Sequence, residues 1–70
     1  MANTYTAITK QVGEWWIGWI EEVPGVNCQE RTREKLLESL TVSLRELLAF
    51  NREEAIHAAA SDYSEEPLRV

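Results

Sequence analysis

The fold is decided by residues 32–48, which read TREKLLESLTVSLRELL. At 100° per residue, the leucines of this stretch fall within an arc of roughly 120°, the width of an apolar stripe that faces one core. They are Leu36, Leu37, Leu40, Leu44, Leu47 and Leu48. Thr32 precedes the stripe as an N-cap, and Glu34 stands in the first turn, where the helix dipole favours a negative charge. The stretch therefore predicts a principal helix that covers a single apolar surface.

Before the helix, the residue pattern changes to that of short strands separated by turns. Residues 4–10 (TYTAITK) and 14–22 (EWWIGWIEE) are rich in β-branched and aromatic side chains, with a turn over residues 11–14 that contains Gly13. Pro24-Gly25 marks the next turn, after which residues 26–29 predict a short third strand. Because consecutive strands usually neighbour one another in space, we expect a mainly antiparallel sheet with the helix on one face.

Two further elements are predicted after the leucine stripe. Asn51 and Glu54 resemble a capping box, so we expect a break near residues 50–54 and a short helix through Ala60. Residues 61–64 predict a loop, and residues 65–70 predict a last strand, which Pro67 restricts to an edge of the sheet. The expected fold class is therefore α+β, a two-layer β-β-β-α-(short α)-β arrangement.

The composition limits the classes of protein to which the chain belongs. A length of 70 residues predicts one domain, residues 1–70. Seven basic and twelve acidic side chains give a net charge of −5, which argues against a nucleic-acid binder and for a basic partner. The single cysteine, Cys28, forms no internal disulfide, which favours the cytoplasm. We expect no membrane segment and no signal peptide, because neither pattern is present in the sequence.

The titratable side chains predict neither a catalytic centre nor a metal site. Glu34 and Glu38 lie one turn apart on the solvated side of the helix. His57 stands beside three alanines, with no carboxylate to orient it and no nucleophile. Cys28 and His57 are too few for a zinc site, which needs about four ligands. We therefore expect no enzymatic activity and no cofactor.

The second strand is apolar on both of its faces. Alternate residues of a strand point to opposite sides, which separates Trp15, Ile17 and Trp19 from Trp16, Gly18 and Ile20. One helix covers only one of these sides, so the other predicts a contact surface for another protein. The alternative is burial of both sides within the monomer, with residues 51–60 as the second cover. The sequence leaves open which side is uncovered.

The order of these motifs resembles that of the HicB-like antitoxin family over about residues 4–50. The resemblance is carried by Tyr5-Thr6-Ala7, by the aromatic strand at residues 15–20, by Val23-Pro24-Gly25-Val26 and by Thr32-Arg33-Glu34 before the leucine-rich helix. Members often have a glycine shortly before the helix-starting threonine, where this chain has Gln29-Glu30-Arg31.

The resemblance implies a degenerate RNase H-like fold without catalytic carboxylates. It also implies an antitoxin that binds and occludes a small basic toxin of the HicA type, an mRNA-cleaving protein, and that forms dimers or higher assemblies. Longer members add a DNA-binding module, which we do not expect here. The partner surface is predicted at the aromatic strand, at Trp15, Trp16, Trp19, Ile20, Glu21 and Glu22. The alternative function is a small homo-oligomeric binding module, because a core of this size contributes only about 3–5 kcal/mol. A residual nuclease is a third hypothesis.

Overall fold

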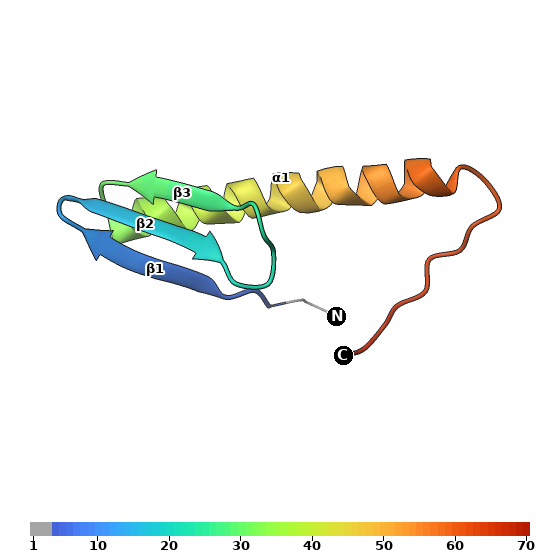
Figure 1. The fold of residues 1–70 in the computed structure, drawn as a ribbon, viewed down its shortest axis with the longest axis horizontal. Helices are drawn as coiled ribbons and strands as arrows, with labels where there is room; N and C mark the ends of the chain where they lie inside the picture. The colour runs from blue at the N-terminus through green and yellow to red at the C-terminus, as the bar shows by residue number, and fades with distance from the viewer. Residues whose placement is uncertain (1–3) are drawn as a thin grey trace.

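The computed structural model describes residues 4–70 and consists of three strands followed by one helix (Figure 1). Strands β1 (Ala7–Val12), β2 (Trp15–Ile20) and β3 (Asn27–Glu30) form one antiparallel sheet in the order β1-β2-β3. Helix α1 (Arg33–Ala59) passes behind the sheet in the view of Figure 1. The predicted α+β class, with a principal helix on one face of an antiparallel sheet, is confirmed.

A two-residue turn joins β1 to β2 and sets their register. Val12 pairs with Trp15, so Gly13 and Glu14 form the whole turn, and Gly13 has a φ of +62°. A positive φ at the first turn residue matches the right-handed twist of the strands, and glycine adopts it without steric cost. The prediction ended β1 at residue 10, whereas the short turn lets pairing continue to Val12.

Helix α1 begins where the sequence predicted. Thr32 has extended backbone angles, and its Oγ1 accepts a hydrogen bond from the Lys35 N–H at 3.1 Å. The Leu36 N–H bonds to the Thr32 carbonyl at 3.0 Å and starts the backbone ladder of the helix. Thr32 is therefore the N-cap.

The core lies between the first half of α1 and the inner face of the sheet. It contains the buried side chains of Ile20, Val26, Leu36, Leu40 and Leu44. Leu36 and Leu40 lie directly over Gly18, because an added Cβ at Gly18 would lie 3.1 Å and 3.2 Å from their side-chain carbons. The missing side chain of Gly18 thus lets the helix approach the middle strand closely.

The two elements predicted after the leucine stripe are wrong. Helix α1 continues without a break through Asn51 to Ala59, and residues 65–70 form no strand. If Asn51 capped a new helix, several backbone hydrogen bonds of α1 would be replaced by one side-chain hydrogen bond. Residues 52–59 are mostly Glu and Ala, which have high helix propensity and favour continuation of α1. The helix ends instead at Ala60, which has a φ of +64°.

The chain is elongated because α1 is longer than the sheet that it covers. The radius of gyration is 15.1 Å, compared with about 11 Å for a compact domain of this length. We call residues 49–59 the protruding helix; Ile56 is its only side chain that is not exposed. Residues 60–70 reverse direction after the helix, and the chain ends below α1 and apart from the sheet in Figure 1. No helix within residues 4–70 is long and apolar enough to cross a membrane.

Candidate functional site

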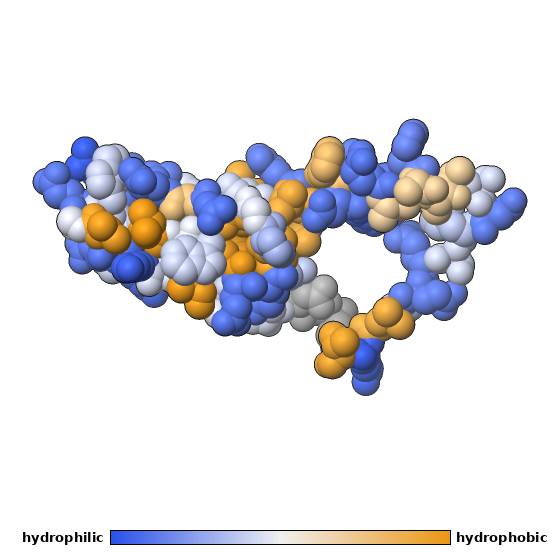
Figure 2. Space-filling view, in the orientation of Figure 1, coloured by the Kyte–Doolittle hydropathy of each residue, from blue (hydrophilic) through white to orange (hydrophobic). Residues whose placement is uncertain are grey.

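One face of the sheet has no helix over it. We call this the open face. By strand alternation and register it presents the side chains of Ile8, Lys10, Val12, Trp15, Ile17, Trp19, Asn27 and Gln29. Figure 2 looks onto the sheet from the side opposite α1, and hydrophobic residues gather there among the strands. Trp15 is 37% exposed and Trp19 is 39% exposed, so no segment of residues 4–70 encloses these indoles.

A cationic side chain lies on the indole at one end of the open face. The guanidinium carbon of Arg31 is 4.1 Å from the centroid of the Trp15 ring. The same guanidinium pairs with the Glu14 carboxylate at 3.6 Å. Both charged groups are well exposed, so the ion pair contributes little to stability. The Arg31 guanidinium thus contacts both the Trp15 ring and the Glu14 carboxylate at this end of the open face.

Two glutamates follow β2 at the other end of the open face. The Glu22 carboxylate accepts hydrogen bonds from the Thr6 Oγ1 at 2.6 Å and from the Thr6 N–H at 2.7 Å. These two bonds, the hydroxyl bond foremost, lower the pKa of Glu22. Glu21 is exposed, and its N–H donates to the Thr6 carbonyl at 2.9 Å. This end of the sheet therefore carries two acidic side chains, and the charged form of Glu22 is stabilised by hydrogen bonds.

The structure separates the predicted partner-binding residues instead of bringing them together. Trp15 and Trp19 lie on the open face, while Trp16 and Ile20 point toward α1. Ile20 is only 6% exposed, and Trp16 packs against the core. A partner on the open face therefore does not touch Ile20.

Strand β1 adds residues to the open face that the sequence analysis did not include. Ile8 is paired with Trp19, Lys10 with Ile17 and Val12 with Trp15. Val12 is 50% exposed. The even spacing of Ile8 and Val12, combined with the turn at Gly13, is the signal that could have located them.

Cys28 and His57, the candidate metal ligands of the sequence, lie at separate places in the structure. No group of three His, Cys, Asp or Glu side chains within residues 4–70 is arranged to hold a metal ion. The Cys28 Sγ lies 3.5 Å from the Ser43 Oγ between β3 and α1, and it is half-buried. His57 lies in the last turn of α1.

Comparisons of the chain with family models, with curated proteins and with solved structures found no match.

Proposed function

We propose that this chain is an antitoxin-like binding protein that occludes a small basic, mRNA-cleaving toxin of the HicA type and has no catalytic activity. The observation that carries the proposal is the open face, where two partly exposed indoles lie on a rigid sheet. The order of motifs shared with HicB-like antitoxins supports the choice of partner, as does the degenerate RNase H-like fold that this likeness implies. Inhibition of this kind needs only contact that blocks access to the toxin's active site.

The open face has the composition of a protein interface. Tryptophan is enriched at the residues that contribute most binding energy, and each indole offers about 150–250 Å² for burial. Trp15 and Trp19 are held in place by the paired strands, so binding orders little additional chain. Asn27 and Gln29 give the face hydrogen-bonding groups at its β3 side.

The charges favour a basic partner at one end of the face. Glu21 and Glu22 lie beyond Trp19, and the hydrogen bonds from Thr6 lower the pKa of Glu22. Arg31 is paired with Glu14, whereas Lys10 on the open face makes no ion pair with residues 4–70. The net charge of −5 further speeds encounter with a positively charged protein.

The test is co-expression with an RNA-cleaving toxin encoded beside the gene, followed by measurement of growth and of the purified complex. The wild-type chain should restore growth and bind the toxin. The double variant Trp15→Ser/Trp19→Ser should weaken binding by at least about 30-fold, because two hot-spot side chains are lost. Val42→Ser is the matched control, since Val42 is 53% exposed on the far side of α1.

Two results would reject the proposal. One is toxicity that persists in the presence of abundant folded protein. The other is a complex whose affinity is unchanged by the double variant while circular dichroism shows an intact fold.

The second candidate function is a homo-oligomeric binding module. The elongated shape and the exposed apolar residues of the open face and the protruding helix favour it, since monomers rarely expose large apolar patches. Light scattering on the purified protein tests it. A monodisperse monomer at high concentration would exclude this function.

A further inference from the structure

Strand β1 has a free edge with unpaired backbone groups. The sheet order places β1 at the edge, and the Thr6 carbonyl accepts a bond from the Glu21 N–H on the β2 side. Backbone groups of successive strand residues point to opposite sides, so those of Ala7, Thr9 and Gln11 point to the free edge. No strand within residues 4–70 pairs with them. This edge is a template for one more strand.

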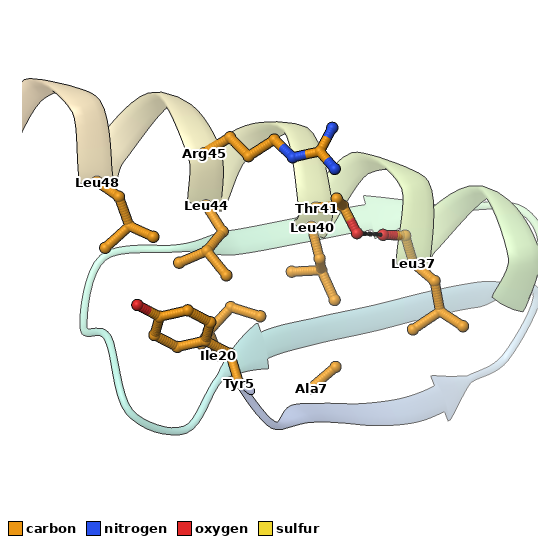
Figure 3. A pocket seen from close by; sticks show the side chains of 9 residues that line it. All are labelled: Tyr5, Ala7, Ile20, Leu37, Leu40, Thr41, Leu44, Arg45 and Leu48. Carbon is orange, nitrogen blue, oxygen red and sulfur yellow. Dashed lines mark hydrogen bonds between the residues drawn. The ribbon is translucent and has the colours of Figure 1, made fainter. Parts of the chain in front are cut away.

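An apolar groove runs along the same strand, between β1 and α1. It has a volume of about 350 Å³. Figure 3 shows its lining: Tyr5, Ala7 and Ile20 on the sheet side, and Leu37, Leu40, Thr41, Leu44, Arg45 and Leu48 on the helix side. Arg45 is exposed and makes no ion pair with any residue that the structure describes. An added strand would place alternate side chains in this groove, beside a free guanidinium.

Residues 65–70 have the pattern that the edge and the groove require. Leu68 is 88% exposed, and Val70 is fully exposed. They are two residues apart, so both face the same side when the segment is extended, and Glu66 faces that side too. Pro67 lacks an N–H, which is tolerated at the start of a strand. Two apolar side chains and one carboxylate thus match a leucine-lined groove and Arg45.

The same chain's Leu68 and Val70 do not line this groove, and both side chains are exposed. Glu65 is held by Arg52 at 3.1 Å, which places it beside the protruding helix. Three extended residues carry Leu68 about 10 Å from there, whereas the helix rises about 18 Å between Arg52 and Leu40. Leu68 therefore stops short of the groove's inner half. The segment of a second molecule is anchored at that molecule's own Arg52, so the position of this helix does not limit which part of the groove it reaches.

We propose that the free edge of β1 and its groove bind residues 65–70 of a second copy of this chain, so that two copies exchange these segments reciprocally. The incoming backbone bonds to the groups of Ala7, Thr9 and Gln11. Leu68 and Val70 enter the groove, and Glu66 pairs with Arg45. Such strand addition takes its affinity from backbone hydrogen bonds and its specificity from alternate side chains. The site is separate from the open face, so this proposal does not depend on toxin binding.

Charge reversal tests the exchange by sedimentation equilibrium. In a homodimer of either variant, Arg45→Glu or Glu66→Lys, both contacts between residue 45 of one copy and residue 66 of the other join like charges. Each variant should therefore raise the dimer dissociation constant about tenfold. An equimolar mixture of the two variants restores opposite charges at both contacts, because each segment lies in the other variant's groove. The mixture should therefore form heterodimers with nearly wild-type affinity, and the Thr9 amide should regain protection from hydrogen exchange.

A second variant keeps the test independent of single ion pairs. Leu68→Asp/Val70→Asp should abolish dimers without changing the helical signal, since both side chains are exposed in the single chain. Val42→Asp is the control, because it adds a charge outside the groove and should leave dimerisation unchanged. A wild-type monomer at millimolar concentration would overturn the proposal. Dimers unaffected by the double variant, or a mixture that restores nothing, would overturn it equally.

Discussion

The guanidinium group of Arg31 lies over the ring of Trp15, with 4.1 Å between its carbon and the ring centroid. Arg31 follows the last residue of β3, and Trp15 begins β2, so this contact joins two strand ends. We expect Trp15→Leu to lower the free energy of unfolding by about 0.5–1 kcal/mol. It should also move the Arg31 side-chain proton resonances downfield, because the ring current is lost. Nuclear magnetic resonance and urea unfolding measure these effects, with Glu14→Gln as the control that keeps the ring.

The close contact of the sheet with α1 at Gly18 predicts a large effect of one methyl group. A Cβ at Gly18 would lie 2.8 Å from the Ile8 carbonyl oxygen, which belongs to the backbone and does not move aside easily. Gly18→Ala should therefore reduce stability by about 1–3 kcal/mol in urea unfolding. Gln29→Ala is the control, because Gln29 lies on β3 with an exposed side chain. A Gly18→Ala variant as stable as this control would contradict the packing.

The two halves of α1 should respond differently to truncation of a large side chain. Leu40 is 1% exposed within the core, so Leu40→Ala should reduce stability by about 2–5 kcal/mol. Phe50 is 56% exposed on the protruding helix, and Phe50→Ala should change stability by less than about 0.5 kcal/mol. Thermal unfolding at a concentration where the chain is monomeric compares the two. Equal losses would mean that the protruding helix is buried in the monomer.

The hydrogen bonds from Thr6 predict a pH dependence at Glu22. They lower the pKa of Glu22 in the folded chain, so the stability that this carboxylate contributes is present above its unfolded pKa of about 4.3. That contribution is lost as the pH falls through the lower, folded pKa. Thr6→Val removes the hydroxyl bond and keeps the N–H bond, and it should raise the Glu22 pKa part of the way to its ordinary value. A carbon-detected titration of the glutamate side chains measures this, and an unchanged Glu22 pKa in the variant would refute it.

The sequence by itself determined the elements with a clear period or a local cap. The leucines fall on one side of a helix whatever lies opposite, and Thr32 caps that helix through a bond only three residues long. Gly13 turns the chain because its backbone alone tolerates the required φ. These features depend on interactions within a few residues, so the order of the three strands and the principal helix follows from the amino-acid sequence.

Only the tertiary structure decided which side of β2 is covered. Both sides are apolar, but Trp16 and Ile20 flank the gap at Gly18 into which Leu36 and Leu40 fit. The side with Trp15 and Trp19 has no such gap and stays open. The sequence analysis did not predict the length of α1 or the course of residues 60–70. The capping signal at Asn51 competed with continuation of the helix, and the strand pattern at Pro67 competed with contacts such as Arg52 to Glu65. Long-range packing decides which side of β2 is buried, since it adds the free energy that distinguishes two apolar sides, whereas helix propensity in residues 52–59 decides the length of α1.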